Sequence, residues 1–142
     1  MIILDRYAIR GAAMIEGAIH NPSNPRHFMQ LDPVGQTVRI RFGDLLVAET
    51  EGAVRMLEMG KCAYAPQYYI PREDISVALT RTDKSTHCPL KGDASYFTID
   101  GADGAREIGW AYETPFDFAA QLAGYIAFDL RRVSITIDAA TA

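Results

Sequence analysis

Apolar and polar residues alternate along much of the chain, a pattern typical of β-strands that bury one face. In the segment TVRIRFGDLLVAET, Val38, Ile40 and Phe42 lie two residues apart with polar residues between them. The alternation stops at the Gly-Asp pair at 43–44, and an apolar run resumes over residues 45–48. Two short runs joined by a glycine-containing pair predict a β-hairpin.

The second half of the chain repeats this pattern. Residues 93–100 and 106–113 flank the loop GADGA, whose two glycines favour a turn, so they predict a second hairpin. The segment 53–59 is ambiguous by its period, and 62–70 is interrupted by Pro66, which favours an irregular or edge strand. Further strands are expected over residues 76–82, 125–130 and 131–138.

Two short helices are expected among the strands. Pro71 is followed by acidic residues, which predicts one helical turn there because proline and negative charge both suit a helix start. The segment 115–124 begins with proline and ends with glycine, and it is the best remaining helix candidate. The sequence as a whole therefore predicts a mainly β domain with one or two short helices.

The N-terminal segment differs from the rest of the chain. Residues 1–20 fit a short helix or a piece of a hairpin. The next stretch, HNPSNPRHF at 20–28, holds two prolines and two asparagines, which disfavours any regular element. We therefore expect an N-terminal extension over residues 1–26 and a single β domain over residues 27–142.

Composition and charge narrow the classes of function. The chain has 142 residues, a net charge of -4 and 49% hydrophobic residues, which suits one soluble domain and argues against binding to a nucleic-acid backbone. No apolar run approaches the length of a membrane span. The N-terminus lacks the pattern of a secretory signal, and the two cysteines cannot build a disulfide framework. We expect a cytoplasmic protein with reduced thiols and no membrane partner.

Cys88 is the first candidate for chemistry. His87 and Lys91 lie close to it in sequence, and nearby cations lower the pKa of a thiol and make it more reactive. The alternative is a cysteine packed beside a turn, because free cysteines are often buried and inert. Both interpretations stay open at this stage.

Metal and phosphate sites have little support in the sequence. Structural zinc sites use pairs of closely spaced ligands, and the chain contains no C-x2-C motif. His87 and Cys88 are adjacent, which points their side chains apart in a strand, and His20 and His27 lie in the irregular N-terminal segment. The loop LKGDAS lacks the features of a phosphate-binding loop, and GADGA lies between strands. We expect no metal site and no cofactor.

Two further groups of residues are candidates for a binding site. Glu73 and Asp74 beside Arg72 suit a general base and an anion clamp, although acids in a first helical turn also stabilise the helix without any function. Trp110 and Tyr112 lie two residues apart and share one face of a strand. Tyrosine and tryptophan suit both a pocket wall and a β core.

Several motifs resemble those of the DUF427 family. YYIPREDI, CPLKGDASYF, WAYETP and GYIAF follow one another in the order and spacing of that family, and VRIRFGDLLVAET and RMLE fit its opening strands. The resemblance covers residues 27–137. It implies a β-tent fold, in which two antiparallel sheets meet at an angle. Zinc-bearing relatives of this fold use two C-x2-C pairs, which this chain lacks, and Asp129 stands where an aromatic residue is usual.

The resemblance also implies a set of site residues. Carried over by motif, the residues expected to line a ligand-binding cleft are Arg55, Glu58, Tyr69, Arg72, Asp74, Cys88, Lys91, Tyr96, Trp110 and Tyr112. Three of them, Cys88, Lys91 and Asp74, are the candidates for a catalytic role. The leading hypothesis is a domain that binds a small polar or anionic ligand in an aromatic-lined cleft. The alternatives are an enzyme that uses Cys88 as its thiol and a structural domain that forms a homodimer.

Overall fold

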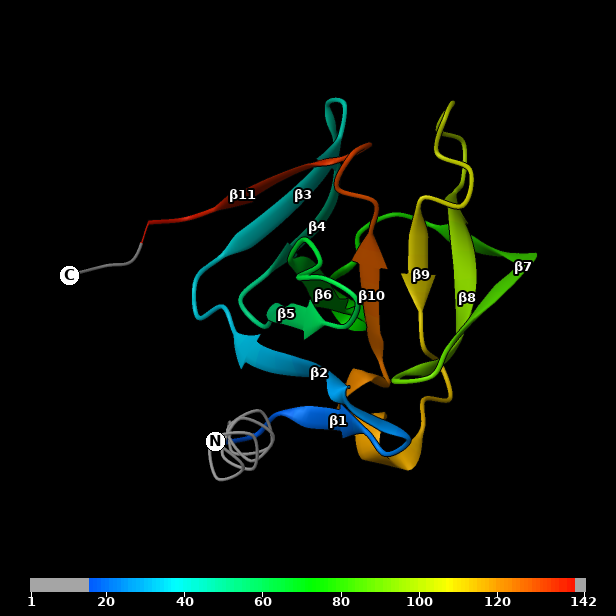
Figure 1. Ribbon diagram of the computed structural model, residues 1–142. Coiled ribbons are helices and arrows are strands. Elements are labelled where there is room, and N and C mark those ends of the chain that lie inside the picture. Colours follow the sequence, from blue (N-terminus) through cyan, green and yellow to red (C-terminus); the bar gives the residue numbers. More distant parts are fainter. Residues whose placement is uncertain (1–15, 140–142) are drawn as a thin grey trace, which may run out of the picture.

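The computed structural model describes residues 16–139 and contains two antiparallel β-sheets (Figure 1). The larger sheet has eight strands in the order β1-β2-β5-β6-β10-β9-β8-β7. Its strands are β1 (Ile19–Asn21), β2 (Asn24–Pro33), β5 (Val54–Met59), β6 (Gln67–Pro71), β7 (Leu79–Cys88), β8 (Gly92–Ile99), β9 (Gly109–Ala111) and β10 (Tyr125–Phe128). The smaller sheet has the order β11-β3-β4 and consists of β3 (Val38–Phe42), β4 (Leu45–Thr50) and β11 (Ser134–Ile137). These findings confirm the mainly β, two-sheet arrangement.

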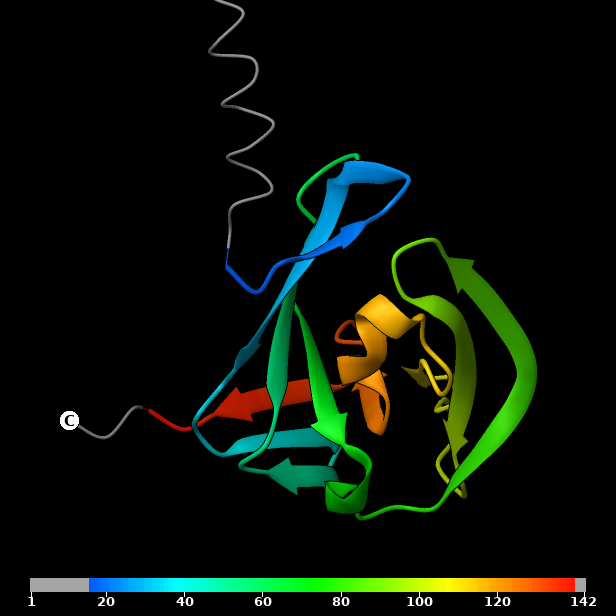
Figure 2. The ribbon, with the colours of Figure 1, turned by 90° about the horizontal axis from the view of Figure 1, so that it is seen from below.

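The two faces of the eight-stranded sheet bury separate hydrophobic clusters. On one face, Phe97 and Phe128 pack with Val38 and Ile40 of the small sheet. On the other face, side chains from β2, β5, β6, β8 and β10 form a second cluster with the 3-10 helix η2 (Asp117–Leu122). Alternation along each strand produces this division, since successive side chains point to opposite faces. Figure 2 shows β2 and β5 on one side of η2, and β7 and β8 on the other.

The segment 20–28 forms parts of two paired β-strands, and the prediction that it contains no regular element is wrong. It forms a hairpin in which β1 pairs with β2 and the chain turns at 22–23. The register shifts between His20 and Asn21, so Pro25 falls in a bulge, and β5 pairs with β2 only from Phe28 onward. A proline in a bulge leaves no ladder hydrogen bond unmade. The carbonyl of Pro25 also lies 2.8 Å from His20 Nδ1.

The domain division proposed at residues 26 and 27 remains a prediction. β2 runs across that position, and β1 lies before it, so both belong to the eight-stranded sheet. The helix or hairpin expected over residues 1–20 falls mostly on residues 1–15, which lie outside the described residues. No helix among residues 16–139 is long and apolar enough to cross a membrane.

Most other elements agree with those expected from the sequence, although their boundaries are shifted. The β3–β4 hairpin and the helical turn after Pro71, which is η1 (Arg72–Asp74), are confirmed. β6 is not an edge strand, because Pro66 precedes it and it pairs with β5 and β10. The strand expected over 76–82 begins later and runs to Cys88, and the helix expected over 115–124 is reduced to η2.

Candidate functional site

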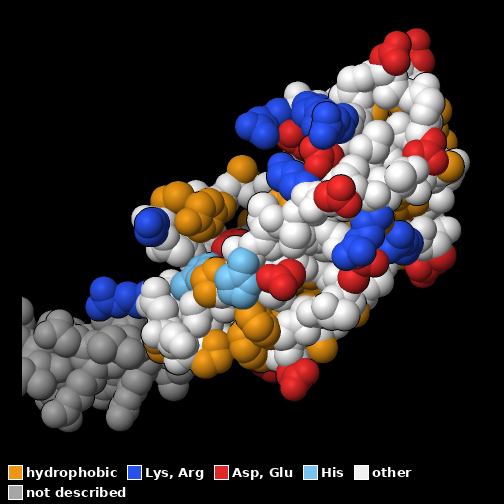
Figure 3. All heavy atoms as spheres, turned by 90° about the vertical axis from the view of Figure 1, so that its right-hand side faces the viewer, with side chains coloured by type: hydrophobic (Ala, Val, Ile, Leu, Met, Phe, Trp, Pro, Cys, Tyr) orange, Lys and Arg blue, Asp and Glu red, His pale blue; other side chains and the backbone are white. Residues whose placement is uncertain are grey.

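A pocket of about 720 Å³ lies on the face of the large sheet that is turned away from the small sheet. Strands β5 to β9 supply its floor and sides, and the loops before β6, before β9 and after β10 supply its rim. Figure 3 shows this side of the molecule, where Lys and Arg side chains gather near acidic ones around a hollow. The lining residues are Met56, Glu58, Tyr64, Ala65, Pro66, Gln67, Tyr69, Lys84, Lys91, Tyr96, Arg106, Glu107, Trp110, Tyr112, Asp129, Leu130, Arg131 and Arg132.

Aromatic side chains form the floor of the pocket. Tyr69 on β6, Tyr96 on β8 and Trp110 on β9 share this face with Tyr112, which directly follows β9. The indole Nε1 of Trp110 donates a hydrogen bond to the Tyr69 hydroxyl at 3.4 Å. Burial raises the pKa of the Tyr69 and Tyr112 hydroxyls. Both hydroxyls therefore keep their protons even in alkaline solution and can donate hydrogen bonds.

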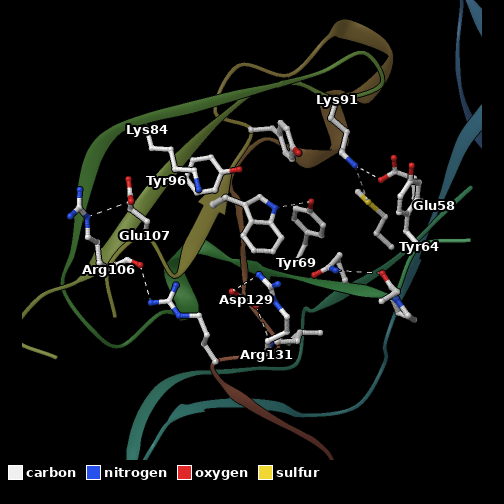
Figure 4. Close-up of a pocket in the computed structure, with 18 residues that line it drawn as sticks. Glu58, Tyr64, Tyr69, Lys84, Lys91, Tyr96, Arg106, Glu107, Asp129 and Arg131 are labelled. Carbon is white, nitrogen blue, oxygen red and sulfur yellow. Dashed lines mark hydrogen bonds and ion pairs between the residues drawn. The ribbon is translucent and has the colours of Figure 1, made fainter. Parts of the chain in front are cut away.

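Lys91 and Glu58 form an ion pair at one end of the pocket (Figure 4). Lys91 lies in the turn between β7 and β8 and is only 7% exposed, whereas Glu58 lies on β5. The ammonium group binds Glu58 Oε1, lies 3.9 Å from Met56 Sδ and sits 5.7 Å from the centre of the Tyr112 ring. Three strands, β6, β10 and β9, separate β5 from β8 in the sheet. The ion pair therefore links two distant parts of a curved sheet.

Glu58 is held in its ionised form by its neighbours. Burial opposes the negative charge, but the attraction of Lys91 and hydrogen bonds from Lys91 and His27 outweigh it. The net result is a pKa of Glu58 below its ordinary value. His27 on β2 provides the second partner, with its Nε2 2.8 Å from Glu58 Oε2. Each oxygen of this half-buried carboxylate thus has its own partner.

The lowered pKa of Glu58 predicts a loss of stability in acid. A carboxylate with a lowered folded-state pKa stabilises the fold fully above its ordinary pKa of 4.5, and this contribution disappears as the pH falls through the folded-state pKa. Urea unfolding from neutral pH down to strongly acidic pH should show this decline. Replacing Glu58→Gln should make the decline shallower. An identical pH dependence in both proteins would contradict the assignment.

A bulge in β7 shapes one wall of the pocket. The register of β7 against β8 shifts between Arg81 and Ser85, so the intervening residues of β7 face Tyr96. Such bulges often redirect a side chain near a functional site. Here Lys84 lies with its ammonium nitrogen 4.3 Å from the centre of the Tyr96 ring, and the Tyr96 hydroxyl is hydrogen-bonded to Thr86 at 2.8 Å.

Glu107 on the rim has a strained backbone. Its φ of 52° is the only positive value of a non-glycine residue within 16–139. Its backbone N–H donates to Thr98 Oγ1 at 3.0 Å, and the Thr82 hydroxyl donates to its carboxylate at 2.8 Å. These bonds hold a conformation that most side chains disfavour. The positive φ of Glu107 interrupts the extended backbone, so β9 begins after this residue and later than the sequence pattern predicts.

Basic residues after β10 complete the rim. Asp129 accepts hydrogen bonds from Arg131 at 3.0 and 3.2 Å, and this lowers the pKa of the Asp129 carboxyl. Arg132 donates instead to the backbone carbonyls of Gly104 at 2.5 Å and Arg106 at 2.9 Å. The rim therefore carries one arginine bound to a carboxylate and another bound only to neutral carbonyl groups.

A family model described as a domain of unknown function (DUF427) matches residues 30–139. The chain belongs to the DUF427 family. This confirms the resemblance seen in the sequence motifs. The match includes every strand from β3 to β11, and it begins within β2. No curated protein matches the chain.

The fold brings part of the site expected from the DUF427 motifs together in one pocket. Six of the ten residues expected to bind a ligand line the pocket: Glu58, Tyr69, Lys91, Tyr96, Trp110 and Tyr112. Five of these six lie on strands or directly beyond a strand end, where alternation places them on a common face. Lys91 reaches the same pocket from a turn.

Three of the expected residues lie elsewhere in this DUF427 domain. Arg55 is exposed, and it points away from the pocket because its neighbour Met56 points into it. Arg72 pairs with Glu113 at 3.7 Å. Asp74 accepts a hydrogen bond from Thr50 at 2.6 Å, which ties η1 to β4. This contact favours a structural role for Asp74 over a catalytic one.

Cys88 is half-buried and lies outside the pocket lining, near Glu58. The two cations expected to activate it are engaged elsewhere. His87 pairs with Asp93 at 2.8 Å, and Lys91 binds Glu58. The hypotheses of a thiol enzyme and of a homodimer remain predictions.

Several site residues have no identifiable signal in the sequence. Lys84, Arg106, Arg131 and Arg132 line the pocket of this DUF427 domain although none belongs to the motifs that predicted the site. They come from a bulge and from loops, whose course cannot be read from alternation. The sequence places His27 in a segment that is expected to be irregular. The pairing of β2 with β5 carries it to Glu58.

Proposed function

We propose that this DUF427 protein binds a small anionic molecule with a planar ring in the pocket. The observation that carries the proposal is the presence of two cations on the pocket lining, Lys84 and Arg132, that pair with no carboxylate among residues 16–139. An anion supplies the partner that these cations lack.

The other cations of the pocket are neutralised within the protein. Lys91 pairs with Glu58, and Arg131 pairs with Asp129. Arg106 lies 3.5 Å from a carboxylate oxygen of its neighbour Glu107. The excess of positive charge in the pocket therefore comes from Lys84 and Arg132, although the whole chain carries a net charge of -4.

The aromatic floor supports a ring as the second part of the ligand. Tyr96 lies beside Lys84, and Tyr64 lies on the opposite side of the pocket (Figure 4). Trp110 lines the same pocket. Aromatic faces attract planar groups and bury apolar area with little loss of side-chain freedom. A ligand that combines a ring with a phosphate or carboxylate group would use both features.

Trp110 provides a direct measurement, because it is the only tryptophan of the chain. Phenyl phosphate should change its fluorescence in a saturable manner, whereas phosphate alone and phenol alone should bind more weakly. Loss of one charge-assisted hydrogen bond costs about 1.5–3 kcal/mol, so Arg132→Ala or Lys84→Ala should weaken binding by about tenfold or more.

Arg39→Ala is a matched control for these variants. Arg39 lies on the small sheet, where it binds Glu49 and Asp138, so its loss should leave binding unchanged. The proposal fails if phenyl phosphate produces neither a fluorescence change nor thermal stabilisation. It also fails if Arg39→Ala weakens binding as much as Arg132→Ala does.

The reducing cytoplasm is the compartment that we propose for the protein. Cys62 is exposed, Cys88 is half-buried, and both are free thiols. Exposed thiols persist where thioredoxin and glutathione keep them reduced.

A further inference from the structure

Three side chains with different ligand atoms meet at the end of the pocket marked by Glu58. His27 comes from β2, Glu58 from β5 and Cys88 from the last position of β7. Their ligand atoms, an imidazole nitrogen, a carboxylate oxygen and a thiol sulfur, all lie within 4.8 Å of one another. All three side chains are partly buried. Segments far apart in the sequence thus deliver three groups that each coordinate transition metals.

We propose that His27 Nε2, Glu58 Oε2 and Cys88 Sγ bind a divalent zinc ion. Zinc accepts nitrogen, oxygen and sulfur ligands together, whereas calcium and magnesium require oxygen ligands. Three protein ligands leave a fourth position of the tetrahedron for water. Because Glu58 also lines the pocket, this position would be accessible from it.

The geometry requires only small shifts of the three ligand atoms. Bonds of about 2.0–2.3 Å in a tetrahedron place ligand atoms about 3.4–3.7 Å apart. His27 Nε2 and Glu58 Oε2 lie 2.8 Å apart and must separate slightly, while the sulfur of Cys88 lies within 4.8 Å of both and needs at most a small adjustment. Rotation about the single χ1 bond of Cys88 can adjust the position of its sulfur.

Lys91 leaves the required oxygen of Glu58 accessible. It binds Oε1, whereas the oxygen that faces His27 is Oε2. Carboxylates that bind metals are commonly held by a hydrogen bond to their other oxygen, which fixes their orientation. The positive charge of Lys91 also offsets part of the negative charge of a carboxylate and a thiolate placed together.

The proton balance of binding is simple. The proton between His27 Nε2 and Glu58 Oε2 is displaced, and the neutral imidazole keeps one proton on Nδ1. This change alters the contact between Nδ1 and the Asn21 amide nitrogen, which lie 3.4 Å apart, because both groups would then be donors and must move apart. The Cys88 thiol loses its proton to solvent when it becomes a ligand.

Cobalt(II) replaces zinc as a visible probe. Protein treated with a chelator should bind one equivalent of cobalt(II) and develop a thiolate-to-metal charge-transfer band, which zinc then abolishes by displacement. Cys88→Ser should remove the band, and His27→Ala should weaken binding by at least about 100-fold, more than the 10- to 100-fold typical of residues that only orient a ligand.

The chain supplies matched controls for both variants. Cys62→Ser removes the exposed cysteine, and His87→Ala removes an exposed histidine, so both should keep the band at full intensity. The proposal is overturned if the folded native protein gives no band, or if the band survives Cys88→Ser. The titration uses metal alone, so its outcome is independent of anion binding in the pocket.

Discussion

Replacing Lys91→Met is expected to lower the free energy of unfolding by about 3 kcal/mol. Methionine preserves most of the buried aliphatic stem but removes the ammonium group that pairs with Glu58. The Glu58 side chain is only 16% exposed, so water replaces the lost partner poorly. Removing one member of a buried ion pair is costly mainly because the other charge is left behind. Urea unfolding at neutral pH measures the loss.

A double variant separates the cost of the unpaired charge from the loss of packing. Lys91→Met combined with Glu58→Gln removes both charges, and it should recover a large part of the stability lost by Lys91→Met alone. Lys61→Met changes an exposed lysine and should alter stability by less than about 0.5 kcal/mol. If the double variant is as unstable as the sum of the two single variants, the ion pair is not the source of the effect.

Replacing Phe128→Ala is expected to lower the free energy of unfolding by about 3–5 kcal/mol. Phe128 is 1% exposed and belongs to the cluster between the two sheets. It lies opposite Gly109 in the pairing of β10 with β9. Its ring occupies the space that a side chain at Gly109 would fill, since a Cβ there would lie 3.1 Å from Phe128 Cε1. Thermal or urea unfolding measures the loss.

The same contact predicts that Gly109→Ala is destabilising, by about 1–3 kcal/mol, because the ring must move. In the double variant with Phe128→Ala, the added methyl group enters the space vacated by the ring. The combined loss should therefore be smaller than the sum of the two single losses. Strict additivity would show that the glycine and the ring do not share this space.

The sequence predicts those parts of the fold that depend on local patterns. Alternation and a glycine-containing turn predict the hairpin over residues 38–48. The structure contains this hairpin as β3 and β4. The segment around Pro25 forms a strand against expectation, because proline disfavours a strand only where the backbone must donate a hydrogen bond. Whether a position lies in a bulge depends on its partner strand, which the local sequence does not contain.

The candidate site is likewise predictable from the sequence only where it depends on local patterns. Tyr69, Trp110 and Tyr112 reach one pocket because each occupies the matching face of its strand, a property of local alternation. Arg132 reaches that pocket through a loop, and His27 reaches Glu58 through the pairing of β2 with β5. These placements depend on long-range pairing and loop geometry. A family motif identified Lys91 and Glu58, but their direct contact across the sheet required the structure.

The contact between Lys91 and Glu58 has a consequence for how this pocket can change during evolution. The two residues join β5 to the turn between β7 and β8, and they also line the pocket. A mutation that enlarges the pocket by removing either side chain also weakens the tie between these parts of the sheet. A descendant adapted to a bulkier ligand would therefore need stabilising mutations elsewhere in the fold, such as better-packed core residues, before it could tolerate that change.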